Sequence, residues 1–338
     1  MLPSARAEST CRTHASCAKS QRTQRVAAAR TPAAAAAGGG EGGRAPCAGV
    51  TEEIRSLLEL ALREDIGSGD VTSLATIPES RQGQGRIFAK EPGILCGVDV
   101  ARCVMDLVDP SVKVEVRALD GTALAAGQDI MILSNSVRSI LAAERLMLNF
   151  LQRMSGIATL TRRYVDVLRQ AGGRMDVVDT RKTTPLWRAL ERLAVRAGGG
   201  RNHRFGLYDM FLVKSNHIEA AGGVKEALRR VWAENEDHRL GVAVEARTVA
   251  EVRDILEVGA DLILLDNMPI KPLREAADLI GGRAQTEITG GVTLRRLRSL
   301  AALPIDRVSI GELTHSPRAL DIALHLRQKR GTRRTRSA

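Results

Sequence analysis

The second half of the chain alternates short apolar runs with amphipathic segments. Six apolar runs each end in a polar or charged residue: MDVVDT (175–180), MFLVKSN (210–216), GVAVEA (241–246), DLILLDN (261–267), QTEIT (285–289) and RVSIGE (307–312). Amphipathic segments such as VKEALRRVWAEN (224–235) separate them. Strands that alternate with helices form parallel sheets. The pattern predicts an α/β barrel. A doubly wound open sheet is the alternative, but it lacks its glycine-rich fingerprint after the first strand.

The first half predicts a smaller domain. Thr51 suits a helix N-cap, and apolar residues follow it at helical spacing until GSGD (67–70). GRIFAKE (85–91) and VKVEVRAL (112–119) alternate as strands of a small sheet do. The long amphipathic stretch from Ser139 to Gln170 is expected to hold two helices, divided near Ser155–Gly156.

These patterns divide the chain into four parts. We expect an α/β domain with a linking helix over residues 51–160 and a barrel over 161–326. Residues 1–50 form a low-complexity extension, and residues 327–338 form a basic tail that we expect to be disordered. The Arg- and Ser-rich, acid-poor residues 1–50 resemble an organelle transit peptide, although we favour a disordered extension or a start codon placed too far upstream.

The positive charge lies at the two ends of the chain. Residues 1–50 carry +5 and residues 327–338 carry +6, which accounts for the whole net charge of +11 at pH 7. Aromatic residues make up only 2% of the chain, so the near-neutral middle offers few rings on which bases could stack. We therefore expect no specific nucleic-acid binding. Weak, salt-sensitive binding of a polyanion by the two ends is a separate hypothesis.

The cysteines and the hydropathy indicate the cellular setting. Cys11, Cys17 and Cys47 lie in the N-terminal segment, and Cys96 and Cys103 lie in the body of the chain. This is no disulfide framework and predicts a reducing compartment. No apolar run approaches the ~20 residues that a membrane-spanning helix needs. We expect a soluble cytoplasmic protein, or an organellar one if residues 1–50 are a transit peptide.

Polar residues follow the ends of the predicted strands. If these strands form a barrel, the side chains meet at one mouth, where barrels place their active sites. The glycine turns at 289–291 and 309–316 suit phosphate binding by backbone N–H groups. The carboxylates Glu245 and Asp266 have three candidate roles: ion pairs with lysines, general base chemistry, or Mg²⁺ binding together with substrate phosphates.

Residues 179–204, DTRKTTPLWRALERLAVRAGGGRNHR, contain seven Lys or Arg but only two acids. Such a concentration of cations predicts a multiply charged anion as ligand, and a di-acid suits it better than a mono-acid. His203 lacks a nearby second metal ligand and is predicted to donate a hydrogen bond to a carboxylate. Three further arginines follow helical spacing and are interpreted as mostly surface residues; they are Arg188, Arg192 and Arg196.

Taken together, these motifs resemble the quinolinate phosphoribosyltransferase family. The resemblance covers about residues 51–326 and rests on motifs that occur in the family's order. They are LREDIGSGDVT (62–72), AAERLMLNFLQRMSGIAT (142–159), RKTTP (181–185), GGGRNHR (198–204), LVKSNHI (212–218), VEA (244–246), LLDNM (264–268) and SIGELTHS (309–316).

The resemblance implies a fold, a reaction and an assembly. The fold is an N-terminal α/β sandwich joined to an incomplete parallel α/β barrel. The reaction transfers phosphoribosyl from phosphoribosyl pyrophosphate to quinolinate, with Mg²⁺, and releases pyrophosphate and CO₂ to give nicotinate mononucleotide for NAD biosynthesis. The assembly is a homodimer, or a higher oligomer, with sites shared between subunits. A related transferase that acts on another ring acid is the alternative.

The resemblance also implies residue roles. Arg145 would reach the partner's site, while Arg181, His203, Arg204 and Lys214 would bind quinolinate. The catalytic group would be Lys182, Lys214, Glu245 and Asp266, of which the two carboxylates would order Mg²⁺. The phosphate would be bound by Thr289, Gly290, Gly291, Ser309, Gly311 and His315.

Three positions depart from the family pattern. Leu186-Trp187 stands where a glycine is usual, Thr289 replaces a serine, and Asn135 occupies a position where glycine is common. We expect the first departure to affect entry to the site and the other two to be tolerated.

Overall fold

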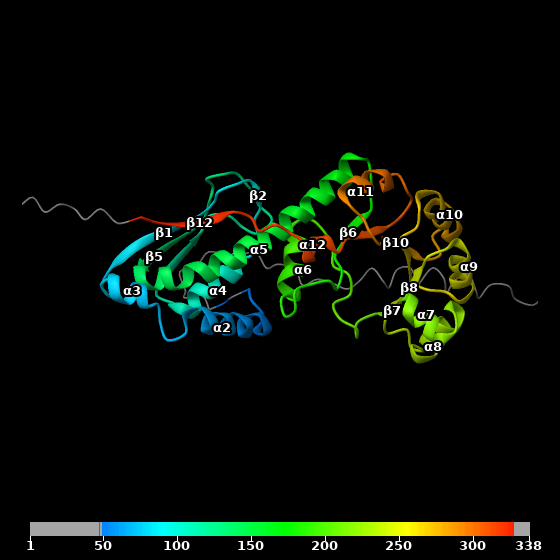
Figure 1. Cartoon of the computed structure of the whole chain (residues 1–338), viewed down its shortest axis with the longest axis horizontal. Helices are drawn as coiled ribbons and strands as arrows, with labels where there is room; N and C mark the ends of the chain where they lie inside the picture. The colour runs from blue at the N-terminus through cyan, green and yellow to red at the C-terminus, as the bar shows by residue number, and fades with distance from the viewer. Residues whose placement is uncertain (1–46, 48, 328–338) are drawn as a thin grey trace, which may run out of the picture. The chain divides into compact units, whose positions relative to one another are not determined.

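The computed structural model of the protein describes residue 47 and residues 49–327 (Figure 1). All six predicted strands of the second half are present and run parallel in one sheet, in the order β6-β11-β10-β9-β8-β7. They are β6 (Asp176–Val178), β7 (Phe211–Val213), β8 (Val242–Ala246), β9 (Leu262–Asp266), β10 (Gln285–Thr289) and β11 (Arg307–Ser309). The first strand in sequence pairs with the last, and β6 and β7 are the two edges. This is an incomplete α/β barrel.

Helices cover the outside of this sheet, as the amphipathic segments predict. They are α6 (Arg188–Ala197), α7 (Ser215–Ala221), α8 (Val224–Glu234), α9 (Val249–Val258), α10 (Ile270–Ile280), α11 (Leu294–Leu300) and α12 (Glu312–His315). All five residues of β8 are buried, because one face packs on helices and the other lines the barrel. Inside the barrel a small apolar cluster contains Ala243, Leu262 and Leu264, with Met210 and Leu212 against it.

The smaller domain is built on an antiparallel sheet in the order β12-β1-β5-β3. Its strands and helices, with a separate β2–β4 pair, are α2 (Glu52–Ile66), α3 (Val71–Thr76), β1 (Gln82–Ala89), β2 (Gly93–Ile94), α4 (Val98–Val108), β3 (Lys113–Val116), β4 (Ala123–Leu124), β5 (Asp129–Ser136) and β12 (Ile322–Arg327). Thr51 caps α2 as expected, by accepting a hydrogen bond from the backbone N–H of Ile54. Because β12 pairs with β1, the chain returns to this sheet after the barrel, within the range that the sequence pattern assigned to the barrel.

One helix, α5 (Val137–Gln170), spans the stretch for which two helices were expected. The break predicted at Ser155–Gly156 is wrong. The Ser155 hydroxyl accepts a hydrogen bond from Cys96 N and donates to Cys96 O. A Cβ atom on Gly156 would lie 2.2 Å from the backbone oxygen of Arg318. These small residues let other segments approach the helix closely and do not interrupt it.

The cysteines differ from the expectation in one respect. Cys47 and Cys103 form a disulfide between the segment before α2 and helix α4, whereas all cysteines were expected to be reduced. Sequence spacing could not reveal this pair, because 56 residues separate the two cysteines and only the fold brings them together. Cys96 is a free, buried thiol. Within the described part of the chain, no helix combines the length and apolar character that crossing a membrane requires.

The close contact at Gly156 gives a prediction whose sign opposes helix propensity. In a helix interior, Gly→Ala normally stabilises by roughly 0.5–1 kcal/mol. Gly156→Ala is expected to destabilise by about 1–3 kcal/mol, because the new methyl group meets the Arg318 carbonyl. Urea unfolding measures the change. Gly241→Ala is the control, since its added Cβ meets nothing nearer than 4.0 Å. A more stable Gly156→Ala protein would contradict the packing described.

Candidate active site

A pocket of about 90 Å³ lies at the carboxyl ends of the barrel strands. Its lining contains seven of the predicted site residues, drawn from the ends of five strands and from the loop between α6 and β7: Arg181, His203, Arg204, Lys214, Glu245, Thr289 and Ser309. The strand pattern placed these residues at one mouth, and the fold brings them together there. Lys182, Asp266, the glycines of the two turns, His315 and Arg145 do not line this pocket.

The pocket gathers positive charge from three segments. Arg204 is 9% exposed and donates from Nη1 to the Met210 carbonyl at 2.9 Å. Burial, and then the nearby charge of Arg181, lower the pKa of the Arg204 guanidinium, which still remains a cation at neutral pH. Lys214 lies on the opposite edge strand, at the end of β7. Cations held this close to one another favour an anionic ligand.

The two carboxylates on neighbouring strands are engaged differently. Glu245 accepts a hydrogen bond from Lys214 Nζ at 2.8 Å and from Ser215 N at 3.2 Å, so one expected ion pair is present. Asp266 accepts from Asn267 Nδ2 at 2.9 Å and lies 3.7 Å from Arg247 Nε. The described residues contain no cluster of three or more His, Cys, Asp or Glu side chains able to hold a metal ion. Two carboxylates alone suit Mg²⁺ only if substrate oxygens and water complete its shell.

His203 has two neighbours that sequence reasoning did not assign to it. Its Nδ1 accepts the backbone N–H of Arg204 at 2.7 Å, so the proton of the neutral ring lies on Nε2. Nε2 lies 3.4 Å from Oε2 of Glu287, a fully buried residue on β10. Glu287 was missed, although an acid in the middle of the apolar run QTEIT is a signal that could have found it. The predicted bond from His203 to a substrate carboxylate stays a prediction.

The turn after β10 takes a backbone form that favours glycine. Gly290 and Gly291 have φ values of +85° and +56°. A Cβ on Gly290 would also lie 2.4 Å from the Asn267 side chain. Arg296 donates to the carbonyls of Gly290 and Met268, each at 2.9 Å, and so ties this turn to the preceding one. The turn is a fixed, side-chain-free surface beside Thr289, as a phosphate site requires.

The turn after β11 brings together residues that are distant in sequence. A Cβ on Gly311 would lie 3.0 Å from the Lys182 side chain and 3.3 Å from the His315 ring. Thr314 Oγ1 donates to the Lys182 carbonyl at 2.7 Å. Ser309 is buried and its hydroxyl lies 3.4 Å from the Ile288 carbonyl. Lys182 and His315 therefore lie at one glycine turn next to the pocket.

The interpretation of the α6 arginines as surface residues is wrong for Arg192 and incomplete for the other two. Arg192 is only 16% exposed and donates to the carbonyls of His203 and Arg204. Burial lowers the pKa of its guanidinium. Arg188 donates to Thr183 Oγ1 and to the Phe205 carbonyl, and Arg196 donates to Asn202. The helical spacing was correct, but this face of α6 packs on two loops, one carrying Arg181 and the other carrying His203 and Arg204. We call these the cationic loops.

Two buried carboxylates hold the same loops from the other side. Asp179 accepts the His203 N–H at 2.7 Å and the Asn202 amide, and burial raises its pKa. Glu191 accepts from the backbone N–H and the hydroxyl of Thr184 and pairs with Arg153 of α5 at 2.9 Å. Both acids are fully buried. They are the two acids already counted against the seven cations, so the segment keeps its excess of positive charge while the acids hold the loop backbone.

Arg145 lies apart from the pocket, exposed on α5 within the smaller domain. The fold of a single chain does not bring it to the other site residues. Its predicted role requires a second subunit.

The geometry defines a barrel whose mouth gathers positive charge, and comparison with known proteins gives its family. Residues 157–325 match the family model described as "Quinolinate phosphoribosyl transferase, C-terminal domain", and residues 70–155 match the corresponding N-terminal domain. The chain belongs to the quinolinate phosphoribosyltransferase family.

Relatives and solved structures agree with this assignment. Quinolinate phosphoribosyltransferase [decarboxylating] 1b of Nicotiana tabacum is 42% identical over 299 residues, which cover 83% of this chain and 84% of that protein. The probable nicotinate-nucleotide pyrophosphorylase [carboxylating] of Bacillus subtilis is 39% identical, covering 80% and 93%. The crystal structure of NadC from Streptococcus pyogenes superimposes with a TM-score of 0.79 at 40% identity, covering 82% and 97%.

Among the departures from the family pattern, the structure accounts for the residues at 135 and 187. Asn135 has a φ of +144°, where glycine is the least strained residue, and its amide donates to Ser111 O at 3.0 Å. Trp187 stacks on Phe150 of α5 with ring centroids 4.7 Å apart, so it packs on that helix. Leu186 is 83% exposed with a φ of +66°. Nothing in the structure explains a leucine there.

The buried role of Arg192 gives a testable prediction. Arg192→Met removes two hydrogen bonds to loop carbonyls and leaves Asp179 without its nearest cation, so it is expected to destabilise the protein by about 1.5–3 kcal/mol. Arg229→Met, on the exposed face of α8, should change stability by less than about 0.5 kcal/mol. Urea unfolding of both variants provides the measurement. Equal, small effects would show that Arg192 is a surface residue after all.

Proposed function

We propose that this chain transfers the phosphoribosyl group of phosphoribosyl pyrophosphate to quinolinate and releases pyrophosphate and CO₂, giving nicotinate mononucleotide for NAD biosynthesis. One observation carries the proposal: Arg181, Arg204 and Lys214, from three separate segments, line one pocket together with Thr289 and Ser309, which precede the two glycine turns. Membership of the family supplies the identity of the ring acid.

The cationic side of the pocket is the proposed quinolinate site. Guanidinium groups bind carboxylates in a bidentate manner, and two of them can hold two neighbouring carboxylates of one ring. We assign this task to Arg181 and Arg204, with Lys214 and His203 beside them. Lys214 is paired with Glu245 in the free chain, so the arriving di-acid competes with that carboxylate for the ammonium group.

The glycine side is the proposed phosphoribosyl site. Thr289, Gly290 and Gly291 present a hydroxyl and backbone N–H groups at one turn, and the 309–316 turn presents Ser309, Gly311 and His315. Lys182 packs against Gly311, where its ammonium group can reach a phosphate. No protein nucleophile is needed, because the pyridine nitrogen itself attacks C1 of the ribose. The chain's residues bind and align the two reactants.

Mg²⁺ is the proposed cofactor, held largely through substrate oxygens and water. Glu245 and Asp266 end neighbouring parallel strands, and the carboxyl ends of both point to the same side of the sheet. When bound, the ion would neutralise charge on the pyrophosphate leaving group. The described residues offer two carboxylates but no complete set of protein ligands. This fits Mg²⁺ and does not fit a structural zinc site.

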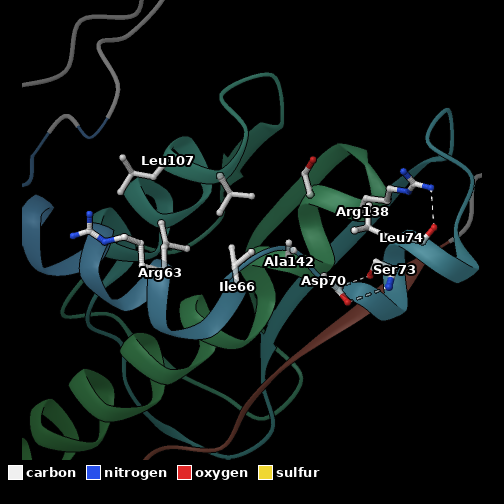
Figure 2. Close-up of a pocket in the computed structure, with 13 residues that line it drawn as sticks. Arg63, Ile66, Asp70, Ser73, Leu74, Leu107, Arg138 and Ala142 are labelled. Atoms are coloured by element: carbon white, nitrogen blue, oxygen red, sulfur yellow. Dashed lines mark hydrogen bonds between the residues drawn. The ribbon is translucent and has the colours of Figure 1, made fainter.

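A homodimer that shares its sites is the proposed assembly. Arg145 is exposed on the same face of α5 as Arg138 and Ala142, which line a separate pocket of about 450 Å³ in the smaller domain (Figure 2). This pocket has apolar walls from Ile66, Leu74 and Leu107. The barrel rim in turn exposes Leu186, Leu207 and Tyr208. Exposed apolar residues beside the mouth and an apolar pocket beside Arg145 support contact between these two surfaces of different subunits.

The alternative is a transferase of the same fold that acts on another ring acid. The number of cations favours a di-acid, because a mono-acid would leave a guanidinium uncompensated.

Several plant relatives carry "mitochondrial" or "chloroplastic" in their names. The transit-peptide prediction falls on residues 1–50, of which nearly all lie outside the described residues.

The substrate assignment has a direct assay. Purified protein with phosphoribosyl pyrophosphate and Mg²⁺ is expected to form product and CO₂ from quinolinate, and no product from nicotinate. Removing Mg²⁺ with a chelator should abolish turnover, and adding it back should restore it. Equal turnover of nicotinate would favour the alternative substrate class.

The role of Arg181 has a measurable magnitude. Arg181→Ala is expected to lower kcat/KM for quinolinate by roughly 10- to 150-fold, because it removes at least one charge-assisted hydrogen bond of about 1.5–3 kcal/mol. Arg230→Ala on α8 is the matched control, since that arginine is 65% exposed and pairs only with helix neighbours in this structure. An unchanged rate for Arg181→Ala would remove Arg181 from the site.

Shared sites can be tested by mixing variants. Arg145→Ala and Lys182→Ala homodimers should each be impaired, because Arg145 and Lys182 of different subunits would complete one site. Heterodimers of the two should regain part of the activity, since one of their two sites is intact. Heterodimers verified by mass spectrometry that show no recovery would contradict sharing.

A further inference from the structure

Three buried side-chain atoms stand without a hydrogen-bond partner among the described residues, and they face one another. They are Nε2 of His203 and both carboxylate oxygens of Glu287. Buried polar atoms are almost always paired, so an unpaired group asks for an explanation. Both side chains also belong to the lining of the substrate pocket, while the three atoms themselves are buried.

The surroundings of Glu287 offset only part of the free-energy cost of burying its carboxylate. Its side chain is fully buried, and besides the His203 ring it has an ion-pair partner in Arg307, whose Nε lies 3.6 Å from Oε2. Arg307 also bonds Gln285, through a donor on Nη2. The strand neighbour of Glu287 on β9 is Leu264, a member of the apolar cluster inside the barrel. An uncharged residue of similar size at this position would make the folded protein more stable.

His203 offers Glu287 a hydrogen-bond donor within the pocket lining, since its Nε2 lies 3.4 Å from Oε2. Arg204 N–H occupies Nδ1, so the ring proton is on Nε2 and points toward Glu287. At 3.4 Å this contact is longer than a good hydrogen bond, and Nε2 remains unsatisfied. A carboxylate of the incoming ring acid would share the single Nε2–H with Glu287 in a three-centre hydrogen bond, so Glu287 would still restrain the ring.

We propose that Glu287 is a positioning residue of the quinolinate site that acts through His203. It restrains the imidazole so that a substrate carboxylate can share the Nε2–H, and the protein retains a buried carboxylate without a hydrogen bond for that purpose. The inference rests on the proposed function. It adds a residue that neither sequence motif nor pocket charge had indicated.

Two substitutions of Glu287, made in the full chain, distinguish a positioning role of this residue from a purely structural role. Glu287→Met removes the acceptor, so KM for quinolinate should rise about 5- to 20-fold while KM for phosphoribosyl pyrophosphate stays within about 2-fold. The Tm of Glu287→Met should be unchanged or higher, since an unpaired buried charge is gone. Glu287→Gln keeps an acceptor oxygen and should restore KM for quinolinate to within about 3-fold of the wild-type value.

Thr286→Val is the matched control on the same strand. Thr286 faces away from the pocket lining and bonds Asp306 with its hydroxyl at 2.7 Å, so its loss should lower Tm and leave both KM values unchanged. In a His203→Asn background, Glu287→Met should cause no further rise in KM for quinolinate, because Glu287 would act through the missing ring.

The outcomes distinguish this inference from the proposed function. A wild-type protein that does not turn over quinolinate removes the proposed function. With an active wild type, a normal KM for quinolinate in Glu287→Met overturns the inference. It is overturned equally by an unfolded Glu287→Met protein, by parallel rises of both KM values, or by an undiminished effect of Glu287→Met when His203 is already asparagine.

Discussion

The structure depends on holding several cations close together at one barrel mouth. Burial lowers the pKa of Arg204, and the nearby charge of Arg181 lowers it further. Such an arrangement is unfavourable unless the surrounding protein fixes it. Two buried acids, Asp179 and Glu191, and the buried Arg192 do so by bonding the backbone of both cationic loops. Because the loops are already ordered, little binding free energy is lost in ordering them when the substrate binds.

The supporting residues connect the mouth to the rest of the fold. Arg153 of α5 bonds both Glu191 and the Thr314 carbonyl, and Thr314 in turn bonds the Lys182 carbonyl. The single helix α5 therefore links the smaller domain, the cationic loop and the last glycine turn. The close approach of the Arg318 backbone to Gly156 belongs to the same arrangement, because it lets the chain leave the barrel and return to the first sheet as β12.

Much of the fold could be predicted from sequence because its signals are local. Each apolar run of the barrel ends in its site residue, and the carboxyl ends of parallel strands meet at one edge. Local patterns could not show what distant contacts decide. Gly156 looks like a helix break until the Arg318 carbonyl is seen beside it, and Arg192 looks exposed because helical spacing does not say which face a helix buries. Glu287 has a local signal, an acid inside the apolar run QTEIT, but its lack of a hydrogen bond can be seen only in three dimensions.

The central claim is that the pocket is built for two carboxylates on one ring. Calorimetric titration of the free protein with quinolinate and with nicotinate, at low and at high ionic strength, tests it most directly. The account predicts that quinolinate binds at least about 10-fold more tightly, because the second carboxylate gains a charge-assisted hydrogen bond. It also predicts that this advantage shrinks as salt screens the charges. Equal affinity for the two acids at low salt would contradict the account.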